Sequence, residues 1–288
     1  MIFTGFICFL LLLQTVESVT TQSPNNLPPK ETTCNINNYY SFHAGPRLEK
    51  IIIEMKTKLE AIEQELKKLS KKEETRKNVP DPVAFFPLNA AHGTKEINNR
   101  AVKAIPRGVT LAPGPDGRPN YSYKFSGSSN SYIEFPNRVG GPLDVRYSMT
   151  MLCWVYYNGK DGSLFSYEKS STWGVHLWVV AGKLFVRFVK RDYSSTNHLL
   201  HTSLAGGWKF VGASYDRSSG EAKLWVNGAV VQTLNIGAGL ELATQDSIRM
   251  GMKTGDRRYF KGRIAQMRIY NRALSQEQVQ AIQKLVAA

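Results

Sequence analysis

Apolar residues follow two different periods along this chain, and the change of period divides it into segments. Between residues 48 and 69 they are spaced alternately by four and by three positions, which is the pattern of one face of an α-helix. Beyond residue 83, short apolar runs are separated by Gly-rich turns, which is typical of β-strands. The pattern therefore predicts a long α-helix followed by an all-β domain.

The helical segment carries a heptad repeat, and Lys58 and Glu63 flank it where they can pair between parallel helices. We expect a coiled coil over residues 47–77 that joins copies of the chain, with dimer and trimer both open because the seam mixes Leu, Ile and Met. The alternative is a single amphipathic helix packed on its own domain. A linker over residues 78–82 follows. The apolar seam consists of Leu48, Ile52, Met55, Leu59, Ile62, Leu66 and Leu69.

The segment from 83 to 288 is predicted to be a β-sandwich, because many short strands occur without helices between them. Asn227-Gly228 between two apolar runs predicts a tight hairpin. One short helix closes the chain, with Ser275 and Gln278 as a capping box and Val279 and Ile282 in its buried stripe. The clearest strand signals lie at 132–135, 149–155, 183–189, 223–226 and 229–231.

The N-terminus carries an apolar run, Phe6 to Leu13, that is too short to span a membrane and typical of a signal peptide over residues 1–18. We therefore expect a secreted, extracellular protein. Residues 19–46, rich in Thr, Pro and Asn, are expected to be disordered. Cys34 in this tail is a candidate for an interchain disulfide, and Asn120 in an Asn-Tyr-Ser sequon is a candidate glycosylation site.

The charge of the chain is strongly positive and lies almost entirely in the predicted sandwich. Residues 83–288 hold 26 Lys and Arg against 13 Asp and Glu, which accounts for +13 of the formal net charge of +14. A surface of this sign attracts acidic polysaccharides, anionic lipid or nucleic acid. In a secreted protein, glycans that carry sulfate are the favoured class, and we expect no nucleic-acid partner.

Four segments in the predicted sandwich resemble laminin-G-like and pentraxin-like domains of the concanavalin A-like group, in the order that the family has them. The resemblance covers residues 83–288 and implies a jelly-roll β-sandwich with a short C-terminal helix, preceded here by the coiled-coil helix. It also implies recognition more often than catalysis. The segments are 123–135, 149–157, 207–228 and the closing stretch 259–275, which contains Ile269-Tyr270-Asn271-Arg272-Ala273-Leu274-Ser275.

The sequence departs from pentraxins at two features. The second cysteine that would pair with Cys153 is absent, and Asp256 stands among Lys253, Arg257 and Arg258 where the pentraxin calcium run is acidic. Calcium takes six to eight oxygen ligands. We therefore expect no cofactor and no metal site. Asp161 and Asp216 are expected to stabilise turns, with a single-ion site of the laminin-G type as the weaker alternative.

We expect no enzymatic activity. Glycosidases of this fold carry clustered carboxylates, whereas Glu134 and Glu168 have no acidic neighbour in the sequence. His176 lies in an apolar run and is expected to be structural. His198 and His201 lack the further ligands of a zinc site. No catalytic residue is therefore predicted.

A basic and aromatic surface is the candidate ligand site. One stripe contains Lys190 and Arg191 beside Lys183 and Arg187, and a second run includes Arg263 and Arg268. The competing interpretation is that these cations only solvate the sheet and that the aromatic rings, with Tyr157 and Tyr167 among them, are core or loop anchors. The candidate ligand-binding residues are Lys190, Arg191, Lys253, Arg257, Arg258, Tyr259, Lys261 and Trp173.

Together these observations predict a secreted homo-oligomer that binds glycans or other extracellular ligands in adhesion or recognition. The alternative function is that of a structural component of an extracellular matrix, such as a mineralised one, whose sandwich domains contact other matrix proteins. Selectivity for sugar structure at physiological salt would distinguish the first from the second.

Overall fold

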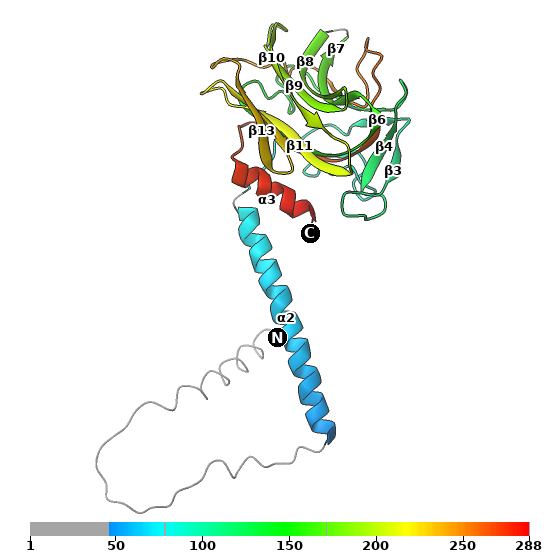
Figure 1. Ribbon diagram of the computed structural model, residues 1–288, viewed down its shortest axis with the longest axis vertical. Coiled ribbons are helices and arrows are strands. Elements are labelled where there is room, and N and C mark those ends of the chain that lie inside the picture. The colour runs from blue at the N-terminus through cyan, green and yellow to red at the C-terminus, as the bar shows by residue number, and fades with distance from the viewer. Residues whose placement is uncertain (1–45, 78, 171, 288) are drawn as a thin grey trace, which may run out of the picture. The chain divides into compact units, whose positions relative to one another are not determined.

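The computed structural model describes residues 46–77, 79–170 and 172–287. The predicted signal peptide and Cys34 lie outside these residues, as does the predicted tail except for Pro46, the first residue of the helix. A long helix and a β-sandwich are the two parts of the described chain (Figure 1).

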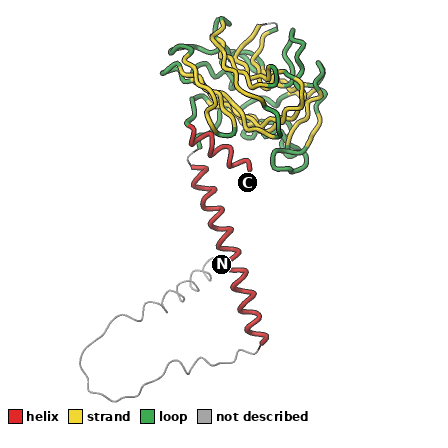
Figure 2. Tube along the Cα trace, in the orientation of Figure 1, coloured by secondary structure: helices red, strands yellow, loops and turns green. Residues whose placement is uncertain are grey.

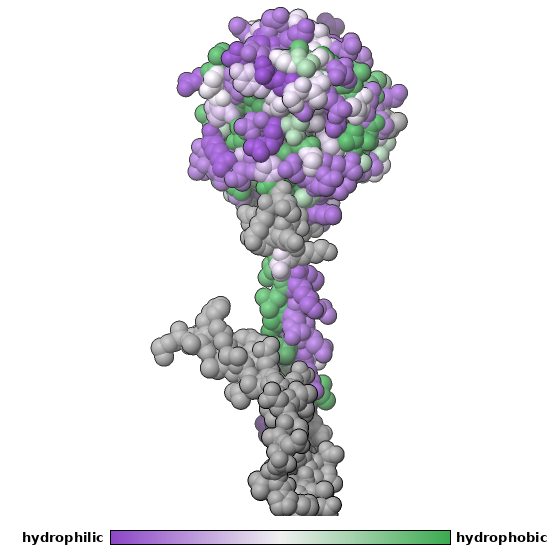
Figure 3. All heavy atoms as spheres, turned by 90° about the vertical axis from the view of Figure 1, so that its left-hand side faces the viewer, coloured by the Kyte–Doolittle hydropathy of each residue, from purple (hydrophilic) through white to green (hydrophobic). Residues whose placement is uncertain are grey.

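Helix α2 runs over Pro46–Lys77, in agreement with the helix that the heptad repeat predicts. Its apolar positions are solvent-exposed: Ile52, Met55, Leu59, Ile62, Leu66 and Leu69 have exposed fractions between 43% and 62%. Hydrophobic residues line one edge of this helix and hydrophilic ones line the other (Figure 3). Assembly of chains through α2 stays a prediction. No helix within the described residues is long and apolar enough to cross a membrane.

The first layer of the sandwich is an eight-stranded antiparallel sheet (Figure 2). Strand β6, which contains the apolar run predicted for the sandwich centre, lies in the middle between β11 and β15. In spatial order the strands are β13 (Ala229–Asn235), β12 (Glu221–Val226), β11 (Trp208–Tyr215), β6 (Met149–Lys160), β15 (Lys261–Tyr270), β4 (Ser122–Ser126) and β3 (Thr110–Ala112), and β1 (Ala84–Phe86) also pairs with β15.

The second layer is a seven-stranded antiparallel sheet, and it carries the candidate site on strands β8, β9 and β10. In spatial order the strands are β10 (Ser195–Ser203), β9 (Lys183–Val189), β8 (Thr172–Val180), β7 (Gly162–Lys169), β14 (Ile248–Met250), β5 (Tyr132–Phe135) and β2 (Ile105–Arg107).

The main core fills the space between the two sheets, because successive residues of a strand point to opposite faces. Ile133 and Phe135 are fully buried, as their alternation predicts. Cys153 is buried with a free thiol, and burial raises its pKa to about 12. The hairpin at Asn227-Gly228 has positive φ at both residues, 51° and 77°, which is the conformation that this dipeptide favours.

A second, smaller core lies on the outer face of the eight-stranded sheet under helix α3, which runs over Gln276–Ala287 (Figure 1). Val279 and Ile282 of the helix are buried against Phe210 and Trp225 of the sheet. The predicted capping box is confirmed, since the Ser275 amide donates to the Gln278 side chain and the Gln278 amide to the Ser275 hydroxyl. The outer face of this sheet is thus partly covered. The all-β sandwich and its C-terminal helix are as predicted.

Candidate functional site

A groove on the outer face of the seven-stranded sheet is the candidate site. Strand β8 alternates between the core, where it places Val175, Leu177 and Val179, and the opposite face, where it places His176 and Trp178. The groove has a volume of about 330 Å³. Its lining, called here the β8–β9 groove, consists of Trp173, His176, Trp178, Val180, Phe185, Arg187, Ser195 and Arg258.

The floor of the β8–β9 groove is aromatic. The ring centroid of Trp173 lies 4.6 Å from that of His176 and 4.9 Å from that of Trp178. The His176 ring stacks on Phe185 at 5.7 Å with an interplanar angle of 17°, and Phe185 stacks in turn on His198 at 5.0 Å. Trp173 and Phe185 are half-buried, so part of each residue is accessible to a ligand.

His176 is a neutral, buried member of this floor. Only 4% of the residue is exposed, and burial lowers its pKa to about 4. Its Nδ1 lies 2.7 Å from the carbonyl oxygen of Gly174, which can only accept, so Nδ1 carries the proton. The prediction of a structural histidine agrees with this burial, although His176 also lines the groove.

Gly174 allows strand β8 to approach its neighbours closely. A Cβ atom at this position would lie 2.6 Å from the carbonyl oxygen of Ala243 and 2.7 Å from Cβ of Tyr167. Contacts this short do not occur without a backbone shift. A residue without a side chain is therefore needed between Trp173 and His176.

Two cations lie over the rings of Trp178 and Trp173. The Arg258 guanidinium stacks over Trp178 at 4.6 Å and is held by Asp256 at 2.6 Å. The Lys253 ammonium lies 4.5 Å from the centre of the Trp173 ring and donates to the carbonyl of Thr254 at 2.8 Å. Cation–π contacts of this kind hold the rings and the charges in fixed positions.

Glu134 and Glu168, which are distant in sequence, are brought to the same arginine. Arg249 of β14 pairs with Glu134 of β5 at 2.7 Å and with Glu168 of β7 at 3.4 Å. Glu168 also accepts from the Thr254 hydroxyl at 2.8 Å. Burial nevertheless raises the pKa of Glu168. Neither carboxylate has an acidic neighbour in the sequence, but antiparallel pairing of β5, β14 and β7 places both on one face of the sheet.

A second, shallower pocket of about 480 Å³ adjoins the groove at Arg258. It contains the predicted site residues Arg257 and Tyr259, together with Tyr157 and Asp161. The Asp161 carboxylate accepts from the Tyr157 hydroxyl at 3.0 Å, from the Gly182 amide at 2.9 Å and from the Ala181 amide. Asp161 therefore stabilises the β8–β9 turn, as predicted.

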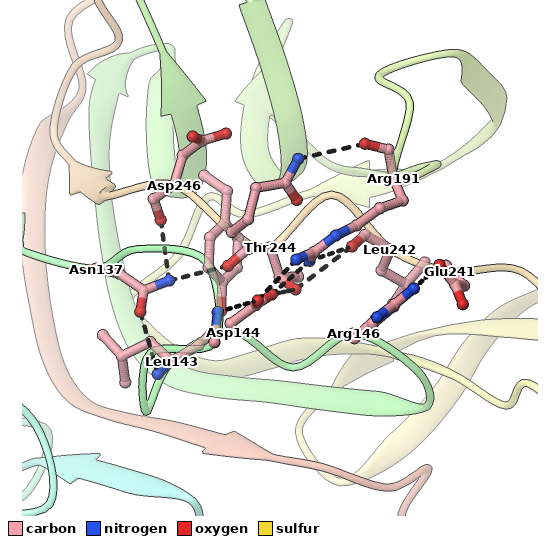
Figure 4. A network of polar contacts seen from close by, with 12 residues as sticks. Asn137, Leu143, Asp144, Arg146, Arg191, Glu241, Leu242, Thr244 and Asp246 are labelled. Carbon is pink, nitrogen blue, oxygen red and sulfur yellow. Dashed lines mark hydrogen bonds and ion pairs between the residues drawn. The ribbon is translucent and has the colours of Figure 1, made fainter.

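Arg191 lies in a network of hydrogen bonds that joins three loops (Figure 4). Its two terminal nitrogens donate to the Asp144 carboxylate at 2.5 and 2.8 Å, and the Thr244 hydroxyl donates to the same carboxylate at 2.9 Å. Burial opposes the charged form of Asp144, but the hydrogen bonds from Arg191 and from the Gly140 amide hold its pKa below the ordinary value. Arg191 is thus committed to a structural contact.

The remaining predicted basic residues do not form one cluster. Arg263 stacks over Tyr156 at 4.1 Å on the eight-stranded sheet, and Arg268 is buried there with its guanidinium 3.9 Å from the Phe85 ring centre. Lys261 lies on β15 beside Gly127, which lines the second pocket. Lys190 forms a β-bridge with Leu242. Of the predicted ligand residues, the groove and the adjoining pocket contain Trp173, Arg257, Arg258 and Tyr259.

The other predicted side chains have these environments. Asn120 is exposed and has a positive φ of 61°, which suits a turn. Tyr167 is fully buried and donates to the Leu143 carbonyl at 2.7 Å, so it belongs to the core. Within the described residues, no group of three or more His, Cys, Asp and Glu side chains is placed to hold a metal ion.

Sequence reasoning missed Trp178 and Phe185 as parts of the site and named Arg187 only as a neighbour of other cations. The signal was present in the alternation of β8 and β9: residues 176 and 178, and residues 185 and 187, share the face opposite to the core. Aromatic and basic side chains on that face do not belong to the core, and reading each strand face separately identifies them.

Comparison with known proteins identifies a family with this fold. Residues 126–280, more than half of the chain, match the family described as the concanavalin A-like lectin/glucanases superfamily. Comparison with curated proteins found no match.

Solved structures with a similar fold include two binding domains of botulinum neurotoxins and one of a mosquitocidal protein. That of botulinum neurotoxin serotype G has a TM-score of 0.56 at 14% identity, over 72% of this chain and 51% of that one. That of Paraclostridial mosquitocidal protein 1 has 0.51 at 16%, over 66% and 48%. The binding domain of botulinum neurotoxin DC, in complex with rat synaptotagmin II, has 0.57 at 14%, over 70% and 51%. The chain thus spans about half the length of these domains, and the likeness establishes the fold alone.

Proposed function

Because the chain belongs to the concanavalin A-like lectin/glucanases superfamily, we propose that its β-sandwich binds a glycan in the β8–β9 groove and acts in recognition outside the cell. The observation that carries this proposal is the aromatic floor formed by Trp173, Trp178 and Phe185 in a groove of about 330 Å³. Residues 176 to 178 of β8 and 185 to 187 of β9 are paired in register, so the rings have fixed positions.

The physical basis is the match between the groove and a pyranose ring. The C–H face of a sugar is apolar and packs on an aromatic ring, whereas its hydroxyl groups need hydrogen-bond partners at the edge. Trp173 and Phe185 supply ring surface, and Arg187 and Ser195 supply polar atoms along the edge. A purely apolar ligand would leave these polar groups without partners.

Binding is proposed in preference to glycan cleavage. Glycoside hydrolysis uses two carboxyl groups, one on each side of the scissile bond. Here Arg249 pairs with both Glu134 and Glu168, and Glu168 also accepts from Thr254. Carboxylates held in this way are not presented to a substrate.

We further propose that the protein is secreted and that α2 joins chains into a dimer or trimer. The apolar run of residues 6 to 13 supports secretion. The exposed apolar edge of α2 supports assembly, because Leu59 and Ile62 are each about half exposed at positions of a heptad seam. Two or three shallow grooves on one oligomer bind a multivalent surface more tightly than one groove does.

A glycan array tests the binding proposal. The full-length protein, Trp173→Ala and Tyr147→Ala are applied at physiological salt. Tyr147 is an exposed aromatic residue that lines neither the groove nor the adjoining pocket, so it controls for the general loss of a ring. We expect selective binding that Trp173→Ala lowers by about fivefold or more and Tyr147→Ala leaves unchanged, since one stacked ring contributes about 1 to 3 kcal/mol.

Equal loss in both variants, or binding that follows charge density and disappears at physiological salt, would contradict recognition in the groove. Silence across the array would move the proposal to a protein ligand. That outcome would favour a role in matrix architecture, and one similar toxin domain is solved in complex with rat synaptotagmin II.

Matched substitutions in α2 test the assembly proposal. Leu59→Asn with Ile62→Asn places amides at two seam positions, and Glu60→Asn with Gln64→Asn places the same residues on the opposite edge. We expect light scattering to give a dimer or trimer for the second variant and a monomer for the first. Two variants with the same mass would refute assembly through this edge.

A further inference from the structure

Arg187 is the cation of the β8–β9 groove that has no carboxylate partner among the described residues. Its Nη2 lies 3.3 Å from Nδ1 of the exposed His198, and its Nε is buried without a hydrogen-bond partner. Arg258, by contrast, is neutralised by Asp256, while Lys253 and Arg249 lie beside Glu168. The groove therefore has a net positive charge, and that charge is at Arg187.

A second donor of the groove also lacks a partner. Trp178 is 1% exposed, and its indole N–H has no hydrogen-bond acceptor among the described residues. The Arg258 guanidinium, which Asp256 holds, stacks over this ring, and Trp178 lines the groove. A buried donor without a partner costs about 1 to 3 kcal/mol. A ligand that brings acceptor oxygens recovers this energy.

The chemistry of the groove thus consists of aromatic faces, donors without acceptors and one unpaired guanidinium. A neutral sugar satisfies the aromatic faces but leaves the guanidinium without a counter-charge. An anionic oxygen on the ring edge satisfies the guanidinium and forms charge-assisted hydrogen bonds, which are the stronger kind. An acidic peptide lacks the flat apolar face that Trp173 and Phe185 fit.

We propose that the β8–β9 groove selects an acidic sugar, and that Arg187 binds its carboxylate or sulfate group while Trp173 and Phe185 pack on the ring. This inference rests on the proposed glycan-binding function and names the class of glycan. Carboxylate and sulfate both present anionic oxygens to a guanidinium. The test therefore compares probes that carry one group or the other.

Calorimetry with matched oligosaccharides tests the inference on the full-length protein at physiological salt. The probes are unsulfated chondroitin and polygalacturonate tetrasaccharides, their carboxyl-reduced forms with neutral backbones, and a sulfated chondroitin tetrasaccharide. The variants are Arg187→Gln, Arg187→Lys and Lys183→Gln. Lys183 is an exposed cation on the same face of β9 that lies outside the groove lining, so both variants lose one positive charge from one strand.

We expect an acidic tetrasaccharide to bind the wild type at least tenfold more tightly than its carboxyl-reduced form. Arg187→Gln should remove this preference, whereas Lys183→Gln should retain it and Arg187→Lys should restore part of it. Preference for the sulfated probe alone, lost in Arg187→Gln, assigns sulfate as the acidic group. Unchanged binding of the reduced backbones by Arg187→Gln shows that the variant is folded.

Three results would overturn the inference. Equal binding of acidic and reduced probes would refute acid selection and leave the glycan-binding function standing. Equal losses in Arg187→Gln and Lys183→Gln would show that the charge acts at long range and not in the groove. If no probe binds at millimolar concentration while neutral glycans bind on the array, acid selection is also refuted. If no glycan binds in either experiment, the proposed glycan-binding function is refuted.

Discussion

Acidification is expected to destabilise this protein through His176. The imidazole is buried and neutral in the folded state, with a pKa of about 4, whereas an unfolded histidine titrates near 6.5. Below pH 6.5 the unfolded chain therefore takes up a proton that the folded chain does not. Stability is lost as the pH falls from about 6.5 towards 4, because the unfolded state binds more protons there.

The size of the effect follows from the two pKa values. A fall in the pKa of His176 from about 6.5 in the unfolded chain to about 4 in the folded one lowers the free energy of unfolding by about 3 kcal/mol once the pH is below both values. Between pH 7 and pH 5 the loss is about 2 kcal/mol. Because the residue is only 4% exposed, solvent screening reduces this energy only slightly. Other groups titrate in the same interval, which makes a variant necessary as the reference.

His176→Phe provides that reference. A phenyl ring retains the stacking on Phe185 and the contact with Trp173 but does not titrate. It removes the donor to the Gly174 carbonyl, for which we expect a loss of about 1 kcal/mol at pH 7.

Urea unfolding of the wild type and of His176→Phe, each at pH 7 and at pH 5, gives the assay. The wild type should lose about 2 kcal/mol more than the variant between the two pH values, whatever their difference at pH 7. Equal losses in the two proteins would refute the account of a buried, neutral His176 at the floor of the groove.

Three further predictions concern stability and accessibility. Asp144→Asn should lower the free energy of unfolding by about 2 kcal/mol at pH 7, because it leaves the half-buried Arg191 without its counter-charge. Since the pKa of Asp144 is lowered in the folded state, the difference in unfolding free energy between wild type and variant should narrow as the pH falls below about 4. Urea titrations that give a constant difference would contradict this. Gly174→Ala should cost about 2 kcal/mol or more, as a Cβ would lie 2.6 Å from a carbonyl oxygen, and calorimetry showing an unchanged melting temperature would refute this close approach. In a Cys34→Ser background a thiol reagent should modify Cys153 only after unfolding, because burial raises its pKa to about 12; rapid reaction with the folded protein would place this side chain outside the core.

The sandwich was predictable because its signals are local. Alternation placed Ile133 and Phe135 in the core, Asn227-Gly228 gave a hairpin, and Ser275 with Gln278 began the last helix. Each of these depends on residues only a few positions apart. The helix over residues 46–77 was predictable for the same reason.

The site was only partly predictable because its contacts join distant segments. Arg249 lies more than eighty residues from either Glu134 or Glu168, and only the order of strands β5, β14 and β7 brings them together. Arg191 appeared as a surface cation because its partner, Asp144, comes from another loop. Density of charge in the sequence does not show which cations are already paired.

The most direct test of the central claim is a spectrum of the indole N–H groups in the full-length protein labelled at tryptophan. The chain has five tryptophans, of which Trp173 and Trp178 lie in the β8–β9 groove and Trp225 is buried under α3. On addition of the glycan that binds most strongly on the array, the signals of Trp173 and Trp178 should shift while that of Trp225 stays in place. Shifts confined to Trp154 and Trp208, on the eight-stranded sheet, would place the ligand elsewhere and contradict the account.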